Sequence, residues 1–125
     1  MPLLNIGRDA MAGRIVGEET AFDEANAHIA VGTGDDNFSA GHTDLQGSET
    51  FRKGMDSGYP QRTGNTMVFK STFEGNEANF AWEEWGVANA SSGGVLLNRE
   101  VEYNSVKLEG QRWIFEVELT VQIGS

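Results

Sequence analysis

The chain has 125 residues, with nineteen Asp and Glu against nine scattered Lys and Arg, and a formal net charge of −10. Phosphate backbones require clustered basic residues, so this balance argues against a nucleic-acid partner. Cysteine is missing from the sequence, which excludes disulfides and thiolate metal sites, and no apolar run approaches the ~20 residues of a membrane span. We therefore expect one soluble domain with no membrane partner.

Residues 5–17 (NIGRDAMAGRIVG) form the one segment that favours a helix. Asn5 is placed to cap its start, Asp9 to favour its first turns, and Gly17 to end it. The apolar residues form a thin stripe that either packs on the domain or contacts a neighbouring subunit: Leu4, Met11 and Ile15.

The first strand signal is residues 28–33 (HIAVGT), where Ile29 and Val31 share one face. Residues 34–47 follow and are rich in Gly, Asp, Asn and Ser, which predicts an exposed connection. A loop of this length in a compact domain is usually functional or an interaction element. Its bulkier side chains are our candidate contacts: Phe38, His42 and Leu45.

Further strands are predicted where apolar and polar residues alternate. Residues 50–53 favour a short edge strand, and alternation recurs over residues 67–73 and 95–103. The final run, residues 111–123 (QRWIFEVELTVQI), alternates longest and predicts a strand with one face in a core and one in water.

Residues 80–87 (FAWEEWGV) break the alternation. Phe80 and Trp82 share one parity and Trp85 the other, which indicates a bulge or kink that shifts the phase by one residue. Both tryptophans are core candidates. If the phase shifts, we expect one of them to point away from the core and to need a partner that covers it.

Together these signals predict a mainly β protein, an antiparallel β-sandwich or flattened barrel with one short N-terminal helix. Sixteen glycines and two prolines suit many turns between strands. Residues 1–125 form a single domain, in which residues 1–20 hold the helical element and residues 27–123 the sandwich.

The sequence gives little support for a catalytic or metal site. Glu83 and Glu84 are adjacent, so in a strand their carboxylates point to opposite faces, and one of them is expected to bond a neighbouring backbone or arginine. His28 and His42 are fourteen residues apart, a spacing that matches no zinc pattern, and turn chemistry explains the nearby aspartates. We expect no enzyme activity, no metal and no cofactor.

The strings HIAVGTG, TDLQG, FRK, YPQRTGNTMVFKSTF and FAWEEWGVANASSGGVLLNRE occur in this order. The ordered set resembles small structural proteins of tailed bacteriophages. It is similar, more distantly, to the N-terminal tail-collar or attachment domains of phage tail fibres. The counterparts are residues 30–34, residues 43–45 with Arg52, and residues 84–87. The likeness spans residues 27–123.

The resemblance implies a virion component without catalysis that assembles with other virion proteins and with copies of itself as a homo-oligomer. No repetitive shaft follows the resembling region, so a tail, collar or baseplate subunit is expected, or else a capsid decoration protein. A carbohydrate- or receptor-binding module is the further alternative. The candidate contact residues are Trp82, Trp85, Phe38, His42, Leu45, Met11 and Ile15.

Overall fold

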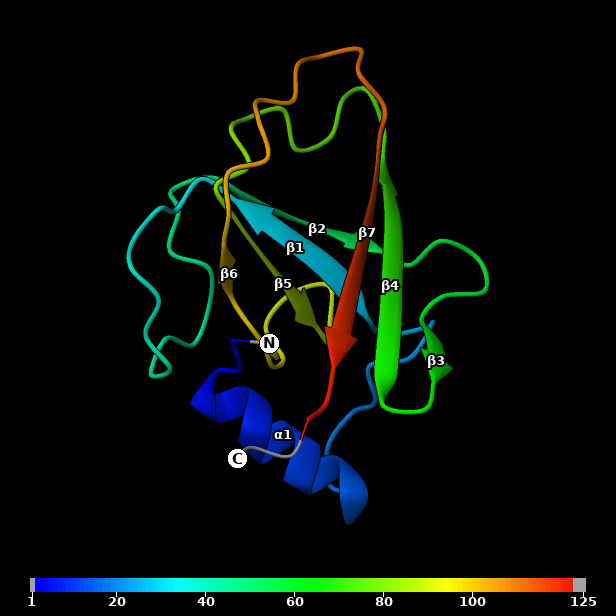
Figure 1. Ribbon diagram of the computed structural model, residues 1–125. Coiled ribbons are helices and arrows are strands. Elements are labelled where there is room, and N and C mark those ends of the chain that lie inside the picture. The colour runs from blue at the N-terminus through cyan, green and yellow to red at the C-terminus, as the bar shows by residue number, and fades with distance from the viewer. Residues whose placement is uncertain (1, 123–125) are drawn as a thin grey trace.

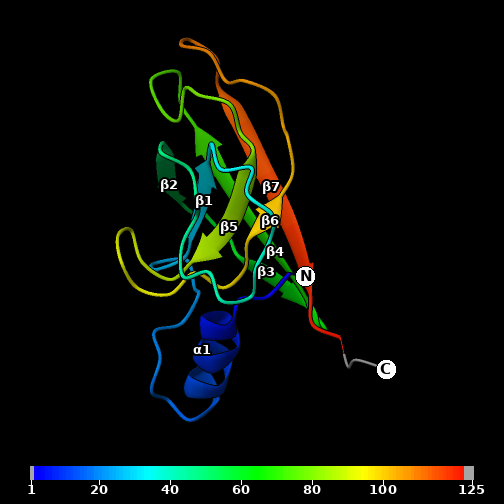
Figure 2. The same cartoon turned by 90° about the vertical axis from the view of Figure 1, so that its left-hand side faces the viewer.

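The computed structural model describes residues 2–122 and contains two antiparallel sheets and one helix (Figure 1). The first sheet has the order β2 (Thr50–Gly54), β1 (His28–Gly32), β5 (Glu84–Ala88) and β6 (Glu100–Val101). The second has the order β3 (Gln61–Thr63), β4 (Thr66–Phe73) and β7 (Trp113–Thr120). The mainly β fold class is confirmed. Helix α1 (Asn5–Ile15) lies at one end of both sheets (Figure 2).

The two sheets pack face to face through the main core. Alternate residues of β1 and β5, among them Ile29 and Val87, meet Phe69 and Phe73 of β4 and Val117 of β7. The pairing of β4 with β7 runs unbroken from Thr66↔Thr120 to Phe73↔Trp113, and this register places the apolar side of β7 inward.

The first sheet is also covered on its other face. Ala30 and Ala88 point there and pack with Leu4, Leu45 and Leu96 in a second, smaller core. Every residue of β5 is buried as a result. A strand with apolar cover on both sides has no solvent face, so even its polar residue, Glu84, is enclosed.

Helix α1 reaches the body of the protein through its small residues. Gly7 and Ala10 are buried, and a Cβ at position 7 would overlap the carbonyl oxygen of Leu97. Gly7, which weakens the helix in isolation, therefore permits its close approach. Of the predicted apolar stripe, Leu4 is buried and Met11 half-buried, but Ile15 is 86% exposed.

The sequence predicts the C-terminal end of α1 correctly and its N-terminal end incorrectly. Leu4, not Asn5, is the N-cap, and no acidic residue lies in the first turn, so the roles expected for Asn5 and Asp9 are wrong. At the other end Gly17 has φ +78°, and Glu18 N–H donates to the Gly13 carbonyl at 2.7 Å. Gly17 thus ends the helix in a Schellman motif, as predicted.

The strand predictions hold best where alternation is longest. β1, β2 and β4 lie within one residue of their expected bounds, and β7 begins two residues later and ends three residues earlier than expected. Residues 95–103 form only the two-residue β6 and isolated bridges, and β3 was not expected. Ile123, the last apolar residue of the final run, lies outside the described residues.

Candidate functional site

An ion pair lies inside the protein beside the polar loop of residues 34–47. Glu84 and Arg99 have fully buried side chains, and Arg99 Nε donates to Glu84 Oε1 at 2.7 Å. Glu84 Oε1 also accepts from Gln46 N–H, and Oε2 accepts from the N–H groups of Gly34 and Gly47, each at 2.8 Å. The carboxylate therefore holds both ends of the loop together.

Arg99 completes this anchor from the other side. Its Nη1 donates to the carbonyl of Asp36 at 3.0 Å and its Nη2 to that of Gly34 at 3.4 Å. Residues 35–39 remain exposed, as predicted, but the loop is tied at its base. The expectation that one of the paired glutamates bonds backbone or arginine is confirmed for Glu84. With four donors around a buried carboxylate, Glu84 acts as a structural anchor.

The outer edge of β7 has no neighbouring strand in the described chain. β7 ends the second sheet, so it pairs with β4 on one side and with no strand of residues 2–122 on the other. Val121 N–H donates to the Asn65 carbonyl at 2.9 Å, in line with the β4–β7 register. Val121 and Asn65 are thus a hydrogen-bonded pair. Hydrogen-bonded and non-hydrogen-bonded pairs alternate along an antiparallel ladder, and residues of the second kind direct their N–H and C=O groups away from the partner strand. The residues of β7 that face the outer edge in this way are Ile114, Glu116, Glu118 and Thr120.

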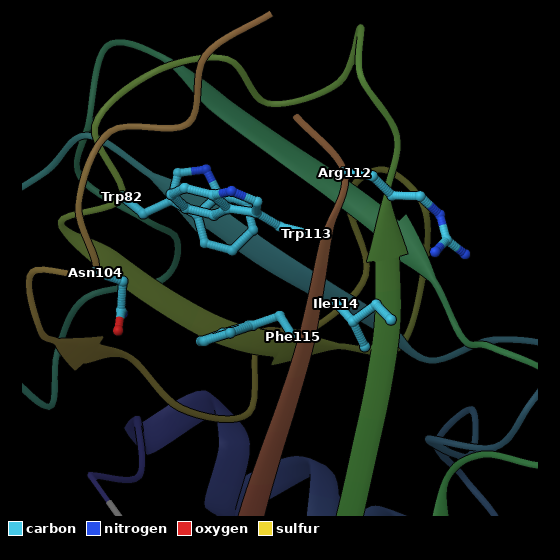
Figure 3. Close-up of a pocket in the computed structure, with 6 residues that line it drawn as sticks. All are labelled: Trp82, Asn104, Arg112, Trp113, Ile114 and Phe115. Carbon is cyan, nitrogen blue, oxygen red and sulfur yellow. The ribbon is translucent and has the colours of Figure 1, made fainter. Parts of the chain in front are cut away.

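Two hollows lie along β7, and we refer to them together as the β7 edge site. The first, about 350 Å³, is lined by Asn104 from the β6–β7 connection, by Trp113, Ile114 and Phe115 of β7, and by Arg112 just before them. Figure 3 shows Trp113 and Phe115 on the same side of β7 as Trp82, whereas Arg112 and Ile114 point to the other side. Trp82 forms the back of the hollow, with its ring centroid 4.9 Å from that of Trp113.

The second hollow, about 250 Å³, lies between β6 and the end of β7. It is lined by Trp85 and Glu100 on one side and by Glu118, Leu119 and Thr120 on the other. Trp85 is 8% exposed, and its indole Nε1 is buried without a hydrogen-bond partner. An orphaned buried donor is uncommon in folded proteins and costs about 1–3 kcal/mol.

Carboxylates surround the β7 edge site. The four ion pairs found within residues 2–122 involve Asp44, Glu77, Glu84 and Glu74. The glutamates at and beside β6 and β7 belong to none of them: Glu100, Glu102, Glu116 and Glu118. The site therefore combines aromatic walls, an acidic rim and an unpaired backbone edge.

The structure divides the predicted contact residues among three places. Trp82 and Trp85 belong to the main core, joined through Phe115 at centroid distances of 5.4 and 6.0 Å. The expectation that one of them points outward is wrong. Regular pairing is interrupted at residues 82–83, and this one-residue phase shift turns both indoles to the same side.

The remaining predicted contacts lie apart from the β7 edge site. Leu45 is buried in the second core, Phe38 is 40% exposed in the loop, and His42 is half-buried with Nδ1 unpartnered. Met11 and Ile15 line a separate apolar hollow of about 250 Å³ on α1. Of these, Leu45 is a core residue without surface for a partner.

The contact residues predicted from the sequence do not include Trp113, Phe115, Glu100 or Glu118. Trp113 and Phe115 alternate within the final run and were assigned to a core face. Both are half-buried, because the second sheet ends at β7. No local signal marks a strand as the last in its sheet, although the paired acidic residues of the outer face, Glu116 and Glu118, are typical of edge strands.

The described residues contain neither a cluster of metal ligands nor a membrane-spanning helix. His28 Nδ1 lies 2.8 Å from the Asn26 carbonyl, and residues 2–122 contain no group of three or more side chains placed to hold a metal ion. In the same part of the chain, no helix is long and apolar enough to cross a bilayer.

Comparison with known proteins gave no match: no family model, curated protein or solved structure is significantly similar to this chain.

Proposed function

We propose that the protein is a structural subunit of a tailed-bacteriophage virion, a tail, collar or baseplate component that binds neighbouring virion proteins. The ordered motifs that resemble phage structural proteins support the virion role. The β7 edge site supports the mode of assembly. The single observation that carries it is an eight-residue edge strand with aromatic hollows beside it.

The edge of β7 suits strand addition. Four consecutive alternate residues, from Ile114 to Thr120, present backbone donors and acceptors with no partner in the described chain. Edge strands with this geometry pair with extended segments of other chains, and side-chain pockets beside the edge supply specificity. Proline, which blocks such pairing in many edge strands, does not occur in β7.

Incorporation into particles tests this proposal. Glu116→Pro removes an outward N–H while leaving the ladder to β4 intact, and Glu116→Gln keeps the N–H and removes only the charge. Labelled chains of both variants are expressed during infection, and the amount that copurifies with particles is measured. We expect the proline variant to be incorporated about tenfold less than the glutamine variant. Equal incorporation, or none for the wild-type chain, would contradict the proposal.

A capsid decoration role uses the same contacts at another place in the particle. Imaging of particles that carry the labelled chain distinguishes the two, since the label then lies on the head surface and not at the tail.

The first hollow favours a second candidate, a carbohydrate- or receptor-binding module. Half-buried Trp113 beside the Asn104 amide combines an aromatic face with a polar group, as in many small-ligand sites. A glycan array with the full chain tests it. Sugar binding that is lost in Trp113→Ala and kept in Phe38→Ala, which removes an exposed aromatic side chain outside this hollow, supports this function.

A further inference from the structure

The second hollow contains two features that the fold itself does not explain. Trp85 is more than nine-tenths buried, yet its Nε1 donor has no acceptor within residues 2–122. Glu100 and Glu118 line the same hollow, and neither carboxylate has a cationic partner within the described chain. An orphaned donor and two uncompensated anions in one hollow are complementary to an occupant that brings a carbonyl oxygen and a positive charge.

We propose that the partner at the β7 edge site is an extended segment carrying Arg or Lys, and that one basic side chain enters the second hollow between Glu100 and Glu118. The segment adds as a fourth strand beside β7, and its carbonyl groups provide the acceptor that Trp85 Nε1 lacks. This inference rests on the proposed assembly function and specifies the chemistry of its partner.

The register of β7 supports this composition. A strand that pairs with the outward groups of Glu116, Glu118 and Thr120 places alternate side chains on opposite faces. Those on the outer face share that face with Glu116 and Glu118, where opposite charges stabilise cross-strand pairs, and the one beside Glu118 lies at the second hollow, which Glu100 also lines. Those on the inner face meet Phe115 in the first hollow. A basic segment with interspersed apolar residues satisfies both faces.

Charge argues against a second copy of this chain as the occupant. The net charge is −10, and the rim of the β7 edge site is itself acidic. The two basic residues of edge strand β2 are already engaged: Arg52 donates to the Ala90 and Gly93 carbonyls, and Lys53 to Glu77. Apposing two acidic edges costs free energy through like-charge repulsion.

The test uses the full chain and three probes: a seven-residue peptide that alternates Arg and Val, the same peptide with Gln in place of Arg, and free arginine amide. Affinity is measured by titration at low salt, and the Trp85 indole resonance is followed by NMR. We expect the Arg peptide to bind about tenfold more tightly than the Gln peptide, and the Trp85 Nε1 proton to shift downfield as it gains an acceptor.

Two double variants test whether the Arg peptide binds at the second hollow. Glu100→Gln with Glu118→Gln is expected to lower affinity for the Arg peptide about tenfold. The control combines Glu18→Gln with Glu109→Gln, which removes the same charge at exposed residues outside the hollow and leaves affinity within about twofold.

Four results would overturn the inference: equal binding of the Arg and Gln peptides, free arginine amide binding as tightly as the peptide, an unmoved Trp85 resonance, or self-association of the chain through these residues in sedimentation. The virion role fails separately. If the chain does not enter particles but binds the Arg peptide, the virion role is rejected and the basic segment stands. If the Glu100→Gln/Glu118→Gln variant enters particles as the wild type does, and the chain binds the Arg and Gln peptides equally, the basic segment is rejected and the virion role stands.

Discussion

Replacing Arg99 by methionine tests the idea that a buried ion pair anchors the polar loop. Methionine fills much of the volume of arginine but donates no hydrogen bond. The Glu84 carboxylate then keeps its three backbone donors and loses the cationic partner that it has among the described residues. At the same time the carbonyls of Gly34 and Asp36 lose their contacts with the guanidinium.

The expected cost follows from the burial. Both side chains are 0% exposed, so solvent does not screen the charge that remains. Removing one partner of such a pair costs about 3–5 kcal/mol. A domain of this size has a free energy of unfolding of about 5–15 kcal/mol, so the loss is a large part of the total.

The complementary change, Glu84→Gln, keeps the shape and removes the charge. Each carboxylate oxygen accepts two hydrogen bonds, so whichever one becomes an amide nitrogen leaves two donors without an acceptor. At about 1–3 kcal/mol for each unsatisfied group, this variant loses about 2–6 kcal/mol. Glu83→Gln is the matched control: it changes the adjacent, half-buried carboxylate, which accepts no hydrogen bond in the structure, and should cost under ~0.5 kcal/mol.

Urea unfolding measures these losses, and hydrogen exchange locates them. The amides of Gly34, Gln46 and Gly47 should lose protection in both buried-pair variants, while those of β4 change only as the global stability does. A loss below ~1 kcal/mol in Arg99→Met, with unchanged protection of the three loop amides, would refute the anchoring role.

Two other changes have clear expected outcomes. The Lys53 ammonium, which donates to Glu77 at 2.8 Å, holds the pKa of that carboxyl below its usual 4.5. The ion pair therefore stabilises the fold above pH ~4.5, and this stabilisation is lost as the pH falls through the lower pKa that Glu77 has in the folded protein. In urea titrations, Lys53→Met should cost about 0.5 kcal/mol of unfolding free energy at pH 7 and almost nothing near pH 2. Gly7→Ala should lower the free energy of unfolding by about 1–3 kcal/mol, because its methyl group overlaps the Leu97 carbonyl and pushes α1 from the sheet; a melting temperature equal to that of the wild type would contradict this.

Alternation of side chains predicted most of the sheet structure, since period-two patterning is a local property of the chain. β7 shows both the strength and the limit of this reasoning. Its apolar positions Val117 and Leu119 are buried as expected, but Trp113 and Phe115 are only half-covered. Which strands lie beside β7 is decided by pairing across distant segments, and the run itself contains no information about it.

Glu84 illustrates the same limit at a single residue. The sequence predicted that one of Glu83 and Glu84 bonds backbone or arginine, but only the second core, with Arg99 and the returning loop, makes Glu84 that residue and encloses it. Gly17 is the opposite case, because a Schellman end needs a left-handed residue and glycine adopts that conformation without strain, so the sequence alone predicted it.

Local chain chemistry thus determined the fold class, the helix end and the longer strands of this protein. The tertiary structure alone decided that both indoles turn inward, that a salt bridge lies buried under the loop, and that β7 is left as an open edge with an acidic rim. The physical reason is that hydrophobic periodicity acts over a few residues, whereas burial and strand partnership depend on segments that meet only when the chain has folded.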